Sequence, residues 1–170
     1  MSKPLKFVAA VGIALGGILG MAGTMVAGAN VRAVCWGIDS TALVLATCLL
    51  ALHFFRKGND AVAAGFLVYA IGEAVMLGGT AGSLEASVPS FAAGAALWSA
   101  GLLLTSIPRA FALWTRATGI IAAVLFATVA LRIFAGESLL PITKPLPYFA
   151  YPFLVLTFIG WIYSLLKTAD

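Results

Sequence analysis

Six long apolar stretches alternate with short polar or proline-containing connections along almost the whole chain. Each stretch is close to the roughly 20 residues that a helix needs to cross a bilayer. The pattern predicts an all-α integral membrane protein, a six-transmembrane-helix bundle whose single transmembrane domain covers residues 1–170. We expect the spans at residues 5–29, 39–55, 61–81, 90–107, 113–134 and 148–166.

Composition supports this assignment and narrows the environment of the protein. Sixty-two per cent of the residues are hydrophobic and 9% are charged, whereas soluble domains carry about 25% charged residues. The lipid bilayer is therefore the expected partner. The net charge of +4 comes mostly from basic residues at the ends of the apolar stretches, so it does not indicate nucleic acid. Alanine- and glycine-rich six-span proteins of this length are numerous in bacteria, and we expect this one in the bacterial cytoplasmic (inner) membrane.

Basic residues are distributed unevenly between the connections on the two sides. With a cytoplasmic N-terminus, seven basic residues fall on the cytoplasmic side and three on the outer side. Basic residues accumulate in cytoplasmic connections, so the count predicts that both termini are cytoplasmic. The seven are Lys3, Lys6, Arg56, Lys57, Arg109, Arg116 and Lys167, and the three are Arg32, Arg132 and Lys144.

Two alternatives concern the organisation of the spans. Lys3 and Lys6 before an apolar run, with small residues at 27–29, resemble a signal peptide with its cleavage site. The run is longer than the typical 7–15 residues or so of a signal core, so we retain it as a first span. Short matches, such as residues 66–68 with 153–155, also leave open an inverted repeat of three plus three spans.

Glu73 is the residue that is most costly to place in a membrane, because it lies in the middle of the third stretch. A carboxylate at this depth costs about 2.5–3.5 kcal/mol on insertion scales. Tyr69 and Thr80 share its helix face, and Trp98 lies at comparable depth in the fourth stretch with an indole N–H that needs an acceptor. These four residues form our predicted substrate- or proton-binding site.

The protonation and role of Glu73 follow from the same position. Desolvation disfavours the charged carboxylate, so we expect the group to be largely protonated at neutral pH unless water reaches it. The structural alternative is a neutral Glu73 that bonds to Tyr69 or to a neighbouring helix and only braces the bundle.

Asp39 and Arg132 are candidates for an outer vestibule. Asp39 has the position of an N-cap for the second span, and its alternative role is an acid at an outer gate. Arg132, near the outer end of the fifth span, either extends to the surface or pairs with Asp39 or Glu137. The proline-rich stretch at residues 139–152 cannot form a regular helix through most of its length, and we interpret it as a stiff outer lid.

Glycines recur at helical spacing in two of the apolar stretches. The first stretch contains a GxxxGxxxG ridge, and in the third stretch glycine returns every seven residues. Such smooth faces allow close approach of another helix. The predicted packing residues are Gly12, Gly16, Gly20, Gly65, Gly72 and Gly79.

The sequence lacks the residues that several kinds of chemistry require. Cys35 and Cys48 do not form a CxxC motif, and His53 is the single histidine. No phosphate-binding loop and no HExxH motif occur. We therefore predict no metal site and no cofactor.

Three functions remain compatible with these observations. The first is a permease or channel protomer for a small solute or a proton-coupled substrate, with the site around Glu73. The second is a membrane-embedded enzyme that acts on an isoprenoid- or quinone-like lipid with Glu73 as general acid. The third is an accessory subunit that docks through the glycine ridge of the first span. As partners, a homo-oligomer and a membrane partner subunit both stay open.

Overall fold

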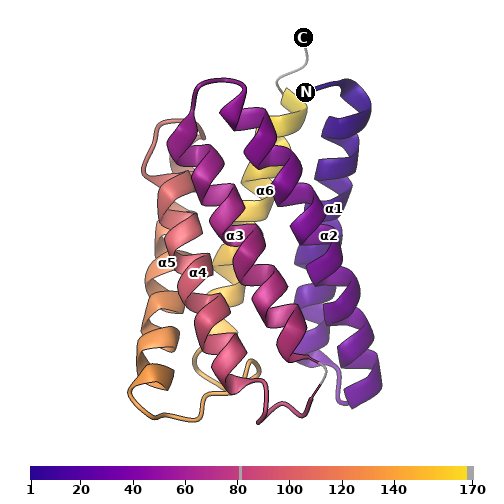
Figure 1. Cartoon of the computed structure of the whole chain (residues 1–170), viewed down its shortest axis with the longest axis vertical. Helices are drawn as coiled ribbons and strands as arrows, with labels where there is room; N and C mark the ends of the chain where they lie inside the picture. The colour runs from indigo at the N-terminus through magenta and orange to yellow at the C-terminus, as the bar shows by residue number, and fades with distance from the viewer. Residues whose placement is uncertain (81, 168–170) are drawn as a thin grey trace.

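The computed structural model describes residues 1–80 and 82–167. Over these residues the chain forms six α-helices and one 3₁₀ turn (Figure 1). The helices are α1 (Lys3–Met25), α2 (Ala29–Phe55), α3 (Asp60–Gly79), α4 (Val88–Ser106), α5 (Leu113–Phe134) and α6 (Tyr151–Lys167), with the 3₁₀ turn η1 (Tyr148–Ala150) directly before α6.

The helices run alternately up and down, and each packs against the next one in the chain. Helix α6 also packs against α1, which closes the bundle into a ring (Figure 1). Within the described part of the chain, six helices are long and apolar enough to cross a membrane. The predicted all-α six-helix bundle is thus confirmed, whereas its orientation and the inverted repeat stay predictions.

The helix boundaries differ most from the expected spans at the α1–α2 turn, where α1 ends at Met25, four residues before the predicted end of the first span at residue 29. Helix α5 has the predicted limits, but α2 begins at Ala29, ten residues before the predicted start of the second span. Arg32 accounts for much of the difference, because its guanidinium donates to the carbonyls of Gly23 (3.3 Å) and Val26 (2.7 Å) at the end of α1. Asp39 therefore lies inside α2 and is not its N-cap. The predicted end of the third span, position 81, lies outside the described residues.

The glycine ridge of α1 packs against α2. A Cβ atom added at Gly12 would lie 2.8 Å from the carbonyl oxygen of Ala42, and one at Gly16 would overlap the side chain of Leu43. Neither position has room for a side chain, so the two helices can approach closely. The ridge is occupied within this chain, which removes the docking face that the accessory-subunit hypothesis required.

Helices α3 and α4 are in backbone contact at two levels. A Cβ atom at Gly65 would lie 2.9 Å from the oxygen of Gly101, and one at Gly101 would lie 2.8 Å from the oxygen of Gly65. The same reciprocal contact joins Gly72 and Gly94, at 3.1 and 2.9 Å. Two contacts seven residues apart on both helices fix the register of α3 against α4, and this register places Glu73 and Trp98 at the same depth.

Replacing Gly16 with leucine is expected to destabilise the protein more than replacing Gly28 with leucine. The new side chain at Gly16 would have to displace Leu43, whereas a Cβ atom at Gly28 would meet only Val31 at 3.8 Å. Overpacking of a dense core costs about 1–3 kcal/mol. Thermal unfolding in detergent measures the difference, and equal melting temperatures would show that the α1–α2 contact is loose.

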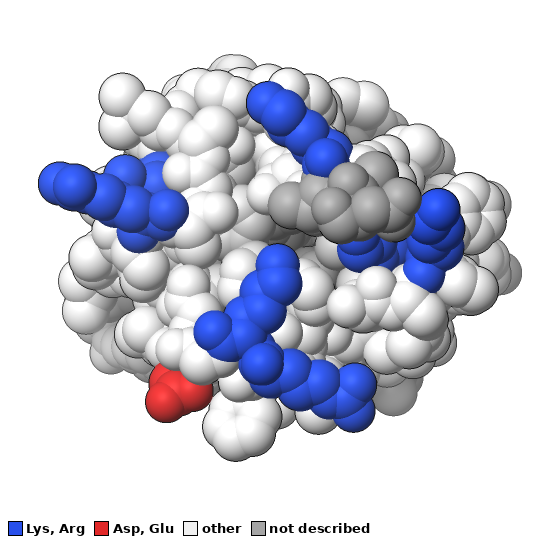
Figure 2. Space-filling model, turned by 90° about the horizontal axis from the view of Figure 1, so that it is seen from above, with Lys and Arg blue, Asp and Glu red and all other residues white. Residues whose placement is uncertain are grey.

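Basic residues gather at one end of the bundle. The start of α1 and the end of α6 lie together with the α2–α3 and α4–α5 connections at this end (Figure 1). Figure 2 views this end and shows Lys and Arg side chains around its rim. Six of the seven basic residues that the sequence assigned to the cytoplasmic side belong to these segments, and the seventh, Arg116, lies in the first turn of α5 next to the α4–α5 connection.

Candidate functional site

A cavity lies inside the half of the bundle that contains the α1–α2 and α3–α4 turns. Its walls come from α1, α2, α3, α4 and α6, and Pro141 of the α5–α6 connection also contributes. The space between the walls is about 700 Å³, counted with its opening, and the centres of water molecules can reach about 80 Å³ of it. One water needs roughly 10–15 Å³ on the latter measure, so the cavity has room for several.

Two carboxyl groups from different helices line this cavity. Asp39 on α2 and Glu73 on α3 are 7% and 2% exposed. The hydroxyl of Ser40, the residue next to Asp39 in the chain, donates to Oε1 of Glu73 at 2.7 Å. Asp39 therefore lines the same cavity as Glu73, whereas the sequence had placed it in a separate outer vestibule.

Several polar atoms at the site have no hydrogen-bond partner among the described residues. They are Oδ1 of Asp39, Oε2 of Glu73, the hydroxyl of Tyr69 and the indole Nε1 of Trp98. The indole of Trp98 packs against Gly72, the residue before Glu73, but its N–H has not found the acceptor that the sequence analysis said it needs. Buried polar groups are normally satisfied by protein, water or ligand. Unsatisfied donors and acceptors beside a cavity of this size indicate that the site holds water or a ligand.

Aromatic rings surround the acidic pair. Tyr69 and Trp98 stack with parallel rings, their centroids 5.4 Å apart and their planes 3° from parallel. Trp36 on α2 lies on another wall and donates from Nε1 to the carbonyl of Gly20 at 3.3 Å. The aromatic lining residues are Trp36, Tyr69, Phe91, Trp98, Tyr151 and Phe158.

Glycine in α1 makes room for the carboxyl of Asp39. A Cβ atom at Gly20 would lie 2.8 Å from Oδ2 of Asp39. The third member of the predicted packing ridge thus positions a site residue as well as a helix. Gly79, at the end of α3, has a similar place beside Ser90 of the cavity wall.

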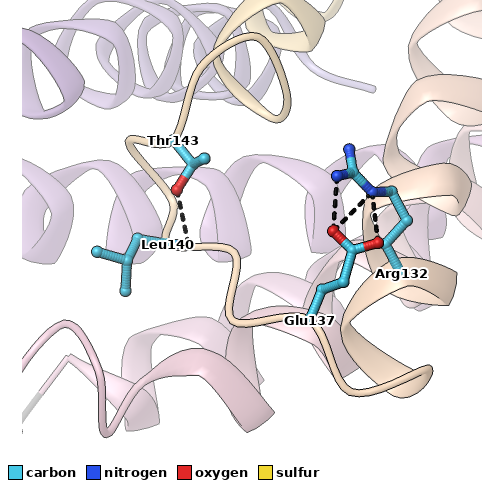
Figure 3. Close-up of polar contacts among 4 residues, drawn as sticks. All are labelled: Arg132, Glu137, Leu140 and Thr143. Atoms are coloured by element: carbon cyan, nitrogen blue, oxygen red, sulfur yellow. Dashed lines mark hydrogen bonds and ion pairs between the residues drawn. The ribbon is translucent and has the colours of Figure 1, made fainter.

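The segment between α5 and α6 covers one side of the cavity. The hydroxyl of Tyr151, at the start of α6, donates to the carbonyl of Pro141 at 3.1 Å. Thr143 accepts a hydrogen bond from the backbone N–H of Leu140 at 2.9 Å and supports the turn (Figure 3). The proline-rich stretch is thus tied to the site through Tyr151.

Arg132 does not line the cavity and forms its ion pair elsewhere. Its guanidinium donates twice to Oε2 and once to Oε1 of Glu137, with the shortest distance 2.6 Å (Figure 3). These hydrogen bonds lower the pKa of Glu137 below its usual value. Both side chains are exposed. The pair holds the start of the α5–α6 connection, and a vestibule role for Arg132 stays a prediction.

The other predicted site residues lie together. Glu73, Tyr69, Trp98 and Thr80 all line the cavity, and the hydroxyl of Thr80 donates to the carbonyl of Leu77 at 2.7 Å. Ser40 and Tyr151 also line the cavity, and the sequence analysis had not included them in the site. The adjacent pair Asp39–Ser40 was the available signal, because an acid and a hydroxyl inside a continuous apolar helix need partners.

A second cavity lies toward the other end of the bundle, near His53 and Lys57. An aromatic layer separates it from the first. Tyr69 lines the first cavity and Trp161 the second, and their ring centroids are 5.9 Å apart. Phe66, which is fully buried, contacts Trp161 at 4.7 Å between centroids. Aromatic rings in mutual contact therefore lie between the two cavities.

These features define an integral membrane protein with a buried acidic cavity inside a closed helix bundle. Comparison with protein-family models, with curated protein sequences and with solved structures found no match. Among the described residues no cluster of three or more His, Cys, Asp or Glu side chains could hold a metal ion.

Proposed function

We propose that the protein is a small permease or channel protomer whose binding site is the cavity containing Asp39 and Glu73. The observation that carries this proposal is the pair of buried carboxyls, one of which accepts a hydrogen bond from Ser40, with unsatisfied atoms beside an accessible space. Intramembrane ionisable groups in a bundle interior mark solute or proton pathways. The two carboxyls have no basic partner in the cavity wall, so protons or a bound cation must neutralise them.

The second cavity supports a pathway through the bundle. Two cavities in opposite halves of the bundle, with aromatic rings between them, are compatible with a carrier that opens alternately to the two sides. Movement of the rings of Tyr69, Phe66 and Trp161 would connect them. An enzyme acting on a lipid would need only the first cavity, so this arrangement favours transport.

The orientation that we propose places both termini in the cytoplasm. The end with both termini carries seven of the ten Lys and Arg residues, and basic residues favour the cytoplasmic side. Reporter fusions after Lys57 and after the C-terminus should report the cytoplasm, and a fusion after Lys144 the outside. An outside signal at Lys57 would overturn this orientation.

Release of solutes from proteoliposomes tests the proposed function. Liposomes with the purified protein are loaded with a mixture of small cationic, neutral and anionic solutes, and the solutes that leave are identified by mass spectrometry. We expect at least one solute to leave faster than from liposomes with Glu73→Gln protein. Equal release from both kinds of liposome, together with chemical conversion of an added isoprenoid or quinone, would show that the protein is an enzyme and not a transporter.

A further inference from the structure

The charges of the cavity wall are of one sign. Asp39 and Glu73 line it, while none of its described lining residues is Lys, Arg or His. The nearest cation on α2, Arg32, donates to carbonyls at the end of α1 and lies 5.9 Å from the ring centre of Trp36. An anionic ligand would meet two carboxyls and no counter-charge. A cation would relieve the cost of burying them.

The remaining surface of the cavity suits an organic cation better than a metal ion. Calcium takes about six to eight oxygen ligands and magnesium requires an octahedral shell. The side chains of Asp39, Glu73 and Ser40 together offer fewer oxygens than either ion requires. Cys35, Cys48 and His53 do not line the cavity, so soft metals lack ligands. Aromatic faces attract ammonium groups, most strongly where water is excluded. The rings around the acidic pair match this chemistry.

We infer that the cavity binds a small organic cation, an amine or quaternary ammonium, in exchange for protons. This inference rests on the proposed function and names its substrate class. A carboxyl of the pair releases its proton to water and becomes a carboxylate that faces the ammonium group. One monovalent cation thus replaces one proton, and the charge of the occupied site does not change.

The competition between proton and cation involves few groups. The titratable residues that face the cavity are Asp39 from α2, Glu73 and Tyr69 from α3, and Tyr151 from α6, while the lining residues of α1 and α4 include none. Binding of the cation requires a deprotonated carboxyl. Affinity therefore falls as the pH falls, by about tenfold per pH unit where one proton is displaced.

Titration with benzyltrimethylammonium tests the inference on the whole protein in detergent. The fluorescence of Trp36 and Trp98, which line the cavity, reports binding, and a weakly buffered solution reports proton release. We expect saturable binding with about one proton released per bound ion. Sodium and benzenesulfonate, added separately at the same concentration, should not reproduce this response.

Variants separate a binding role from a structural one. Glu73→Gln and Asp39→Asn should each weaken binding at least tenfold, whereas Glu85→Gln, at an exposed carboxylate of the α3–α4 turn, should leave it unchanged. Trp98→Phe should bind more tightly than Trp98→Leu, because phenylalanine retains an aromatic face. Melting temperatures without ligand identify any variant that fails to fold.

The possible outcomes distinguish a failure of this inference from a failure of the proposed transport function. Glu73-dependent binding of sodium or benzenesulfonate, without binding of benzyltrimethylammonium, would overturn the organic-cation class and leave a transport site. Binding of benzyltrimethylammonium that is equal in wild type and Glu73→Gln would overturn the assignment of the cavity. Glu73-independent solute release from proteoliposomes would overturn the proposed function itself.

Discussion

Glu73→Gln is expected to reduce transport to the level of protein-free liposomes while the protein stays folded. Glutamine keeps the size of the side chain and can still accept the hydrogen bond from Ser40, which is 2.7 Å from Oε1. It removes the proton that the site must exchange. The melting temperature should change by no more than about 3 °C, roughly 1 kcal/mol for a chain of this size. Solute flux and thermal unfolding, measured on the same preparation, check both parts.

Two further variants give this experiment its controls. Glu85→Gln makes the same substitution at an exposed carboxylate outside the cavity, so flux should be normal. Glu73→Ala leaves the hydroxyl of Ser40 without its acceptor, and an unsatisfied buried group costs about 1–3 kcal/mol. It should therefore lose stability as well as flux. Normal flux in a folded Glu73→Gln protein would show that Glu73 only braces α2 against α3.

Gly101→Ala is expected to destabilise the bundle and to weaken the site with it. The added Cβ atom would lie 2.8 Å from the oxygen of Gly65 and 3.0 Å from the backbone nitrogen of Tyr69. These are backbone atoms, so α3 and α4 must separate rather than a side chain rotate. The cost of such overpacking is about 1–3 kcal/mol. Thermal unfolding and ligand binding should decline together, because Tyr69 and Trp98 lie on these two helices.

Gly78→Ala is the matched control for Gly101→Ala. Gly78 also lies within a helix, but a Cβ atom there would have no atom within 4 Å. Alanine is favoured over glycine inside a helix by about 0.5–1 kcal/mol, so this variant should be as stable as the wild type or slightly more stable. A similar loss in both variants would mean that α3 and α4 are not in backbone contact at Gly101.

The sequence predicted one part of the site because that part depends on helical periodicity. Tyr69, Glu73 and Thr80 share a helix face by their spacing alone. Short connections make consecutive helices antiparallel neighbours, which places Trp98 of α4 at the depth of Glu73. Local spacing and chain order together therefore brought these four residues to one cavity.

The rest of the site depends on interactions that spacing does not reveal. The early start of α2 places Asp39 and Ser40 within the helix, and it rests on Arg32 bonding to the end of α1. In the sequence alone this contact cannot be seen, and a charged residue such as Arg32 between two apolar stretches indicates a loop. Tyr151 reaches the cavity because α6 packs against α1, a contact between the first and last helices. The packing of the last helix against the first is a tertiary contact that local sequence patterns do not predict.

The central claim is that Glu73 faces a space that small molecules can reach, and not a sealed helix contact. Labelling with dicyclohexylcarbodiimide, an apolar reagent that reacts with protonated carboxyls in membranes, tests it most directly. Tryptic peptides from labelled membranes, analysed by mass spectrometry, should carry the adduct at Glu73, and prior addition of benzyltrimethylammonium should reduce it. An unlabelled Glu73 under conditions that modify other buried carboxyls, or labelling that no solute reduces, would contradict the account.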